Sequence, residues 1–344
     1  MTSRYSQAGV NLKLARSVKA TLPFMLRRAT RPEVMGKIGA FGGLFRAAFS
    51  GCQDPILVAS MDGVGTKIRV AVEMRRHDTV GQDLVNHCCN DIAVMGAEPL
   101  FFLDYLGTGK LEKRVFEEVI AGLARGCVEA GVALLGGETA QMPGFYRERD
   151  YDLVGTIVGV VDRRRIWNAV RVKDGDVVVG LASTGLHTNG YTLARHVLFE
   201  RLKLRVTSRV PELGGMTVGE ALLEVHRNYH PLLAQLRRKR IVIHTAAHIT
   251  GGGFEENICR VLPRHHAVRI RRGAWKIPPV FELIRRGGRV SEDEMYRVFN
   301  MGIGMVLLVP RASVAFIHAE ASQKKIAAYE IGCVVGGRPS VTLE

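Results

Sequence analysis

The chain has 344 residues, with 48 lysines and arginines against 33 aspartates and glutamates, so its formal net charge is +15. Hydrophobic residues make up 47% and charged residues 24%, which is ordinary globular usage and excludes a mainly disordered chain. No stretch approaches the roughly 18 consecutive apolar residues of a membrane helix, and no apolar signal segment follows the first residues. We therefore expect a cytoplasmic protein without a membrane partner. The six cysteines form no CxxC pair, which favours free thiols over a zinc site.

Apolar patterning alternates strands with helices along the whole chain, which predicts an α/β (α+β) fold. In the first half we expect a helix at residues 111–127 and strands at residues 55–59, 132–135 and 151–161. A turn signal at 172–176 follows an arginine-rich stretch, so the domain boundary is placed near residue 170, giving domains 1–170 and 171–344. In the second half we expect a helix at 218–238 that breaks near Pro231, and strands at 177–181, 241–244, 303–309 and 327–335.

An acidic, glycine-rich segment follows the first predicted strand. Residues 62–67 (DGVGTK) combine a strand-end carboxylate, two glycines and a lysine. The carboxylate suits a hard cation such as magnesium, the glycines let the backbone approach a phosphate, and the lysine adds positive charge. The spacing is not that of a Walker A loop. We expect a phosphate–magnesium site here, whereas the glycine cluster at residues 39–43 fits an anion loop or a flexible turn equally well.

Polar side chains interrupt an apolar pattern at residues 83–91, where a helix is expected. Asp83, His87 and Asn90 would share one face, with Asp91 only slightly rotated from it. Acids and amides are costly to bury without partners, so a role as cation ligands explains them economically. His87 by itself indicates nothing, because a lone histidine is more often a satisfied core or surface residue.

Three further loops carry polar and glycine residues. Residues 136–143 (GGETAQMP) follow a predicted strand and offer a second carboxylate for a magnesium ion that bridges phosphates. Residues 183–191 (STGLHTNGY) and 248–254 (HITGGGF) each open an expected helix, where backbone N–H groups favour anions. Together these loops indicate a nucleotide–magnesium site that faces an anionic co-substrate, without a nucleophilic triad or a redox dithiol.

The excess of basic over acidic residues has three possible explanations. Short arginine clusters occur, but there is no long basic tail and no basic stripe with interleaved aromatic residues. A solvated basic surface therefore ranks first, anionic substrates second and nucleic acid third. Binding of RNA at near-physiological salt, without ATP turnover, would favour the third.

These motifs, with residues 96–105 (GAEPLFFLDY) and 295–300 (MYRVFN), resemble those of the phosphoribosylformylglycinamidine cyclo-ligases (aminoimidazole ribonucleotide synthetases) of purine biosynthesis. The match runs in the same order from about Tyr5 to the C-terminus. The resemblance implies two mixed αβ domains, a homodimer paired through the N-terminal domains, and ATP with Mg²⁺ bound near the dimer interface between the domains. It also implies a ligase that closes an imidazole ring on a phosphorylated ribonucleotide, after ATP has phosphorylated a formyl oxygen.

The resemblance assigns roles to individual residues. The magnesium-binding acids would be Asp62, Asp91 and Glu138. The other ATP-binding residues would be Gly63, Gly65, Thr66, Lys67, Gly136 and Gly137. His187 would contact the reacting centre and Lys67 would be a second catalytic residue. The substrate-binding residues would be Asn189, Thr250, Gly251 and Gly252.

One position departs from the family pattern. A lysine is expected near the end of the first helix, where this chain has Pro23 and where the nearest lysine, Lys19, lies one turn earlier. Either Lys19 substitutes for it, or its role is dispensable, or the activity is altered. The alternative functions are another small-molecule kinase of the same superfamily, a basic nucleic-acid-binding homologue without turnover, and an inactive regulatory homologue.

Overall fold

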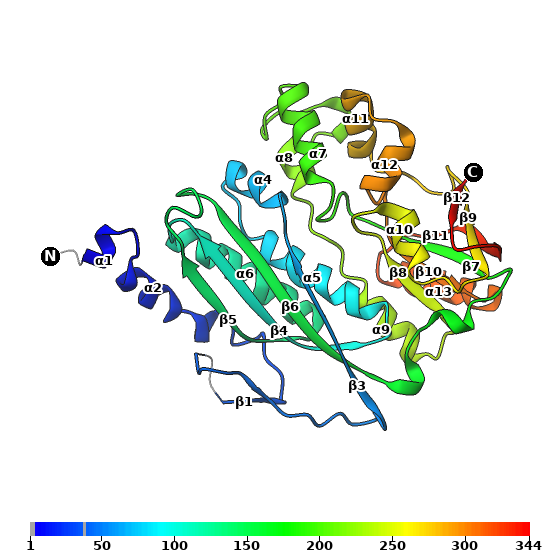
Figure 1. Ribbon diagram of the computed structural model, residues 1–344, viewed down its shortest axis with the longest axis horizontal. Helices are drawn as coiled ribbons and strands as arrows, with labels where there is room; N and C mark the ends of the chain where they lie inside the picture. Colours follow the sequence, from blue (N-terminus) through cyan, green and yellow to red (C-terminus); the bar gives the residue numbers. More distant parts are fainter. Residues whose placement is uncertain (1–3, 37–38) are drawn as a thin grey trace.

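The computed structural model describes residues 4–36 and 39–344 and shows two large sheets, each packed with helices, and a small antiparallel sheet of Val34–Met35 and Leu44–Phe45 (Figure 1). The four-stranded sheet has the order β3-β6-β4-β5, and the six-stranded sheet has the order β12-β9-β11-β7-β10-β8. The first sheet is built from residues 55–162 and the second from residues 177–343. The mixed αβ class expected from the alternating pattern is confirmed.

The first half of the described chain contains the four-stranded sheet and its helices. Its elements are α1 (Arg4–Gln7), α2 (Leu12–Lys19), α3 (Leu22–Met25), β1 (Val34–Met35), β2 (Leu44–Phe45), β3 (Pro55–Gly63), α4 (Lys67–Met74), α5 (Val80–Ala93), β4 (Glu98–Thr108), α6 (Lys113–Ala130), β5 (Ala133–Gln141) and β6 (Tyr151–Asp162). The expected linker contains two 3-10 turns, Arg163–Arg165 and Ala169–Arg171.

The second half contains the six-stranded sheet. Its elements are β7 (Val177–Ala182), α7 (Tyr191–Arg195), the π-helical turn η3 (His196–Arg201), α8 (Val218–Leu222), α9 (His230–Arg238), β8 (Thr245–His248), α10 (Gly253–Cys259), β9 (His266–Ile270), α11 (Pro279–Gly288), α12 (Glu292–Val298), β10 (Ile303–Val309), α13 (Val314–Gln323), β11 (Ala328–Gly336) and β12 (Val341–Leu343). Across residues 4–36 and 39–344, no helix combines the length and the apolar character needed to cross a membrane.

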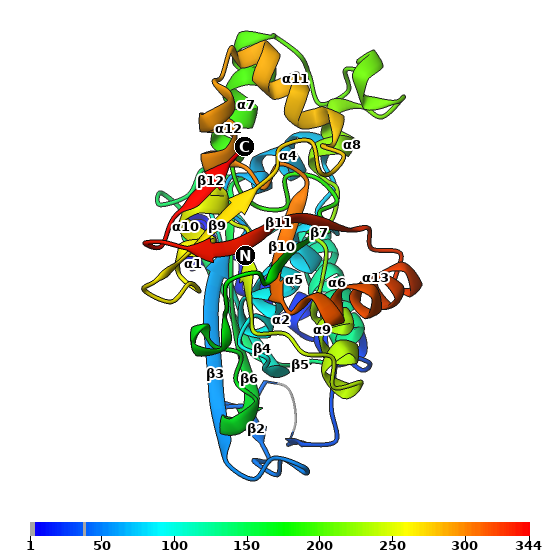
Figure 2. The same cartoon turned by 90° about the vertical axis from the view of Figure 1, so that its right-hand side faces the viewer.

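The four-stranded sheet has two different faces. Helices α5 and α6 lie on one side of it (Figure 2), and residues such as Phe102 and Ile157 are fully buried on that side. Side chains alternate between the faces of a strand. On β3 the alternate residues Leu57 and Met61 consequently point away from these helices, and they are 62% and 69% exposed. One face of this sheet therefore forms the core, and the other presents apolar side chains to the outside.

Glycines bring α5 and α6 close together on the covered face. A Cβ atom at Gly81 would overlap the carbonyl oxygen of Val119, and one at Gly122 would overlap the carbonyl oxygen of Asp78. Gly126 is also tight, because a Cβ there would lie 2.9 Å from the Cβ of Val85. The absence of side chains at these positions lets the two helix backbones touch and fixes how α5 lies on the sheet.

Several boundaries differ from the sequence expectations. The strand expected at 241–244 is wrong, because the ladder with β10 forms at Thr245–His248. The helix expected to break near Pro231 is already interrupted over residues 223–229, and Pro231 lies in the first turn of α9, where no backbone N–H donor is needed. Strand β4 was not expected. Strand β5 continues to Gln141, so Glu138 lies within a strand and not at its end.

Replacing Gly81 by alanine tests the close contact between α5 and α6. We expect Gly81→Ala to lower the free energy of unfolding by roughly 1–3 kcal/mol or more, because the added methyl group forces the helices apart. Gly42→Ala is the matched control, since a Cβ there meets nothing within 4 Å and its φ is not positive. Urea denaturation measures both variants, and an equal effect of the two substitutions would contradict the packing account.

Candidate active site between the two halves of the chain

Six ionisable side chains meet where the two halves of the chain come together. They are Asp62, His87, Asp91, His187, His226 and His248. The first three come from β3 and α5, and the other three come from the loop after β7, the segment before α9 and the end of β8. All four imidazoles are buried, whereas the carboxylate of Asp62 is 43% exposed. The cluster thus has a buried imidazole side and an acidic side that is open to solvent.

His87 connects the two carboxylates. Its Nε2 lies 2.8 Å from Asp62 Oδ2 and 3.6 Å from Asp91 Oδ2. Burial disfavours the charged ring, but the hydrogen bond to Asp62 and the charge of Asp91 outweigh it and raise the pKa of His87. Burial likewise acts to raise the pKa of both carboxyl groups, and their hydrogen bonds with His87 and His248 outweigh it and lower the pKa. Both aspartates are therefore ionised at neutral pH, and both carboxylates lie beside Nε2 of His87.

Asp91 is held by two further contacts. His248 Nδ1 lies 2.8 Å from its Oδ1, and the hydroxyl of Ser60 donates to its Oδ2 at 3.1 Å. His248 stands at the end of β8 in the second half, whereas Ser60 lies on β3 in the first half. The carboxylate of Asp91 thus joins the two sheets.

His187 has a strained backbone and a neutral ring. Its φ of +62° is in the left-handed region, which costs a residue other than glycine of order 1–3 kcal/mol and is typical of functional sites. Its Nε2 accepts long hydrogen bonds from the backbone N–H groups of Thr184 (3.3 Å) and Arg227 (3.4 Å). Its buried Nδ1 has no partner within the described residues. Burial, reinforced by nearby positive groups, sets the pKa of His187 well below its ordinary value, so the ring is uncharged.

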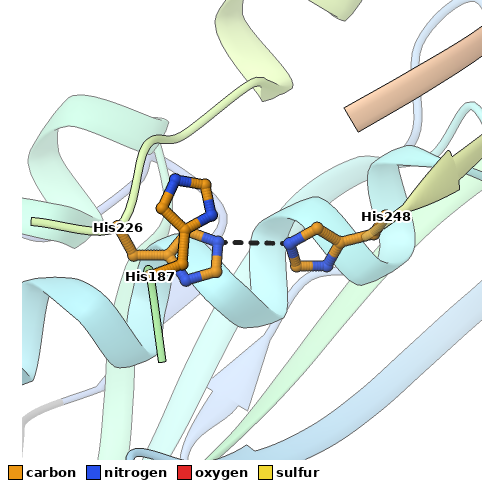
Figure 3. A group of neighbouring side chains, drawn as sticks. All are labelled: His187, His226 and His248. Atoms are coloured by element: carbon orange, nitrogen blue, oxygen red, sulfur yellow. Dashed lines mark hydrogen bonds between the residues drawn. The ribbon is translucent and has the colours of Figure 1, made fainter. Parts of the chain in front are cut away.

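His187 and His226 stack face to face. Their ring centroids are 4.0 Å apart at an interplanar angle of 19°. Figure 3 shows these two rings beside that of His248, with the hydrogen-bond contact between His226 Nε2 and His248 Nε2 at 3.1 Å. Burial also lowers the pKa of His226 and His248.

The polar residues of α5 bind the backbone of the second half. Asp83 Oδ1 accepts from the backbone N–H of His226 at 2.7 Å, and Asn86 Nδ2 donates to the backbone carbonyl oxygen of His226 at 2.7 Å. Asn90 accepts from the N–H of Tyr229 and donates to the carbonyl of Arg227, both at 2.8 Å. The cation role expected for this face does not fit Asp83 and Asn90, because Asn90 binds backbone groups and Asp83 binds a backbone N–H group and the ammonium group of Lys67. Of the two carboxylates Asp83 and Asp91, only that of Asp91 contacts imidazoles of the cluster.

Lys67 lies in a different place from the one its motif suggests. It is fully buried, its Nζ lies 2.8 Å from Asp83 Oδ2, and it donates to the carbonyl oxygen of Glu224 at 2.7 Å. Burial lowers the pKa of Lys67 and raises that of Asp83, and their mutual attraction offsets only part of this cost. The geometry therefore gives Lys67 an interdomain contact and leaves its ammonium group unavailable to a phosphate.

The rest of the first glycine loop is accessible. Gly63 donates its N–H to Asp62 Oδ1 at 2.6 Å, and Gly65 takes a φ of +67° that favours glycine. Thr66 precedes α4, and its hydroxyl lies 3.2 Å from that of Thr192 in the second half. Gly65 and Thr66 are exposed, so this loop forms an open rim beside Asp62.

Glu138 is not brought together with Asp62 and Asp91 within this chain. Asp62 pairs with Gly155, Gly155 with Asp104, and Asp104 with Gly137, so three strand spacings separate β3 from β5. At ~4.8 Å per spacing, the next residue, Glu138, lies roughly 14 Å from Asp62. It is 3.8 Å from Lys19 Nζ instead.

Glu138 lines a cavity of about 470 Å³ at the edge of the four-stranded sheet. This second cavity is separate from the imidazole cluster. Its lining includes Lys19, Pro23, Asp104, Gly136, Gly137 and the glycine cluster at residues 39–43. Burial raises the pKa of Asp104 to about 7. The expected ATP-binding residues are thus divided between this cavity and the Asp62 rim.

The expected substrate-binding residues lie together in the second half. A Cβ at Gly251 would lie 3.4 Å from the side-chain oxygen of Asn189. The amide nitrogen of Asn189 is buried without a partner in the described part of the chain. Thr250 and Gly251 belong to the loop that precedes α10, and their carbonyl oxygens accept from the side-chain amide of Asn257. Gly252, in the same loop, has a φ of +88°. An unsatisfied donor beside this loop is what a polar substrate group would bind.

Sequence reasoning missed part of the cluster. His87 was given no role, although its positions i−4 and i+4 hold Asp83 and Asp91, a spacing that points all three side chains along one helix face. His248 was read only as part of a loop that opens a helix. His226 has no local signal, because only the fold brings its segment against α5.

The fold and the site define a class: two-domain αβ proteins whose polar site lies at the contact between the domains. The chain belongs to the AIR synthase-related family, since it matches the "AIR synthase related protein, N-terminal domain" over residues 47–161 and the corresponding C-terminal domain over residues 173–344. It is 48% identical to a phosphoribosylformylglycinamidine cyclo-ligase of Syntrophotalea carbinolica, over 98% of this chain and 97% of that protein. It is 45% identical to one of Geobacillus thermodenitrificans, with the same coverage.

Solved structures share the fold at low identity. A thiamine-monophosphate kinase of Stenotrophomonas maltophilia has a TM-score of 0.70 at 17% identity, covering 94% of this chain and 96% of its own. The hydrogenase maturation protein HypE of E. coli has a TM-score of 0.65 at 17% identity, covering 97% and 93%. These likenesses concern the architecture alone.

The substitution Lys67→Met tests whether Lys67 serves the interdomain contact. We expect it to cost about 3–5 kcal/mol of unfolding free energy, because it leaves the carboxyl group of Asp83 buried without its cation. The control Lys113→Met removes an exposed lysine, 3.8 Å from Glu117, and should cost no more than ~0.5 kcal/mol. Chemical denaturation compares the two. A Lys67→Met protein with unchanged stability would contradict the contact assigned here.

Proposed function

We propose that this protein is an ATP-dependent cyclo-ligase that converts formylglycinamidine ribonucleotide to aminoimidazole ribonucleotide in cytoplasmic purine biosynthesis. The observation that carries the proposal is the interdomain cluster, in which Asp62 and Asp91 contact His87 and His248, and His248 contacts His226, on which the neutral ring of His187 stacks. The relatives that match over almost the whole chain at 45–48% identity carry the name of this activity.

Asp62 and Asp91 fit a magnesium ion. Their carboxylate oxygens are hard ligands, one oxygen of each lies within 3.6 Å of His87 Nε2, and Asp62 is open to solvent. Mg²⁺ held there would neutralise charge on the phosphates of ATP. Gly63, Gly65 and Thr66 offer an exposed loop beside these acids for the phosphates. Glu138 lies too far away to share the ion within one chain, and we assign it to the second cavity.

The second cavity suits the remainder of the nucleotide. Gly136, Gly137 and the glycine cluster at residues 39–43 allow close approach, and Lys19 brings a positive charge beside Glu138. Lys19 and Pro23 line the same cavity. This supports the interpretation that Lys19 takes the role of the lysine expected at the position of Pro23. Since ATP and the ribonucleotide are both anions, the +15 charge agrees with these substrates.

The reaction needs a leaving group on the formyl carbon. The formyl oxygen attacks the γ-phosphorus of ATP, ADP departs, and an iminophosphate forms. The amidine nitrogen of the same molecule then attacks the formyl carbon, the carbon–oxygen bond breaks, and inorganic phosphate leaves with that oxygen. Because the attack is intramolecular, positioning supplies much of the acceleration. Asn189, Thr250, Gly251 and Gly252 are proposed to hold the substrate in this conformation.

His187 is proposed to act at the formyl group. Its ring is neutral and buried, and its Nδ1, on the ring edge that lies against Gly304, has no hydrogen-bond partner among residues 4–36 and 39–344. A neutral imidazole either donates a hydrogen bond to developing charge or transfers a proton between nitrogen and oxygen. The long bonds from Thr184 and Arg227 hold the ring in place without consuming that capacity.

We further propose that domains 1–170 and 171–344 bind ATP and the ribonucleotide respectively, and that the chain forms a homodimer. The apolar face of the four-stranded sheet, with Leu57 and Met61 exposed, supports pairing through the N-terminal domain. A small-molecule kinase of the same superfamily is not favoured, because the kinase neighbour shares 17% identity and the cyclo-ligases share 45–48%. A nucleic-acid-binding role has no comparable support.

Asp62→Asn tests the magnesium site. We expect ADP release in the presence of formylglycinamidine ribonucleotide to fall by roughly 10²-fold or more, because charge stabilisation of the phosphates is lost. The melting temperature should change little, since Asp62 is partly exposed. Asp54→Asn is the control for the same substitution at an exposed position outside the cluster. Unchanged turnover in Asp62→Asn would remove Asp62 from the site.

His187→Ala tests the role of the imidazole. We expect kcat to fall by about 10²–10⁴-fold, the range that general acid–base groups contribute, while the affinity for ATP measured by calorimetry stays close to that of the wild type. His196→Ala, which removes an exposed histidine, should leave both quantities unchanged. Equal losses of ATP binding and of turnover would contradict the assigned role.

A further inference from the structure

Three imidazoles of the second half converge in the buried part of the cluster. His187, His226 and His248 each offer one ring nitrogen, and these three nitrogens all lie within 4.8 Å of one another (Figure 3). All three rings are at least nine-tenths buried. The proposed reaction uses His187 alone of these three, so the convergence of the other two rings needs its own explanation.

The hydrogen bonds of the cluster fix which nitrogens carry lone pairs. His248 Nδ1 faces the carboxylate of Asp91 at 2.8 Å and so carries the proton, which leaves a lone pair on its Nε2. Asn90 accepts from the N–H of Tyr229, so its amide nitrogen is oriented as a donor to His226 Nε2 at 3.1 Å. His226 Nε2 therefore also presents a lone pair, and it lies 3.1 Å from His248 Nε2.

The lone pair of His226 Nε2 accepts from Asn90 Nδ2 and that of His248 Nε2 lies 3.1 Å away, so an ion that binds both nitrogens would take the place of the Asn90 hydrogen bond. Imidazole nitrogens prefer late first-row divalent ions, and Mg²⁺ prefers oxygen. The third nitrogen comes from His187, whose bonds from Thr184 and Arg227 are long, at 3.3 and 3.4 Å. The ring of His187 is stacked on that of His226 in the structure. For all three ring nitrogens to coordinate one ion, the His187 ring must rotate so that it is no longer parallel to the His226 ring.

We propose that His187, His226 and His248 form a binding site for a late first-row divalent ion of the Zn²⁺ type, next to the magnesium site proposed at Asp62 and Asp91 and joined to it by the contact of His248 with Asp91. Three protein nitrogens with an open fourth position are an established donor set for Zn²⁺. The proposal concerns ion binding by these side chains and stands whether or not the proposed reaction is correct.

Calorimetric titration of the full-length protein with Zn²⁺ alone, in buffer containing excess Mg²⁺, tests the site. We expect one equivalent to bind and excess Mg²⁺ not to compete. His226→Gln should weaken binding by more than about tenfold, since changing even an outer partner of a metal ligand costs 10–100-fold. His196→Gln, which removes an exposed histidine, is the matched control and should bind Zn²⁺ as the wild type does.

Two measurements on the wild type keep the test decisive if His226→Gln fails to fold. Zn²⁺ should raise the melting temperature, because it binds the folded state. Co²⁺ in its place should give the intense visible absorption of four-coordinate geometry. If the folded wild type binds no Zn²⁺, or if folded His226→Gln binds it with unchanged affinity, the proposal is overturned.

Discussion

The structure depends on one buried polar contact that Lys67 of α4 and three residues of α5 make with the segment at residues 224–229. Lys67, Asp83, Asn86 and Asn90 satisfy five backbone groups of that segment from the opposite half of the chain. Buried donors and acceptors without partners are costly, so any other packing of the halves that buries these groups unpaired is disfavoured. The contact thereby fixes how the two halves meet, and it places His226 beside His187 and His248.

The candidate site has a charged side that is open to solvent and a buried side that is uncharged. The carboxylates of Asp62 and Asp91 are ionised because His87 and His248 offer them hydrogen bonds, and they remain at the open side of the cluster. His187 lies behind them with a neutral ring, since burial and neighbouring positive groups disfavour its charged form. Two carboxylates on one side and an uncharged imidazole on the other suit the phosphoryl transfer and proton transfer of the proposed reaction.

Local patterns predicted the strands with uninterrupted apolar or β-branched runs, and the structure confirms β6, β7, β10 and β11 near their expected positions. The strand at 241–244 failed because its apolar residues Ile241 and Val242 stand just before the segment that pairs with β10. Tertiary pairing, which no local pattern encodes, decided that register. Asp62 and Asp91 could be selected from sequence because acids beside glycines or inside an apolar helix are conspicuous, whereas the Lys67–Asp83 pair requires knowledge of which residues face each other.

The sequence by itself determined the αβ class, the order of the motifs and the family, because these depend on local propensity and on which residue types follow one another. Only the tertiary structure decided that Lys67 is buried against Asp83, that Glu138 lies in a separate cavity, and that His226 joins the imidazole cluster. These outcomes follow from contacts between residues far apart in the chain. Such contacts depend on how the two halves pack, and the chemistry of a short segment does not reveal its distant partners.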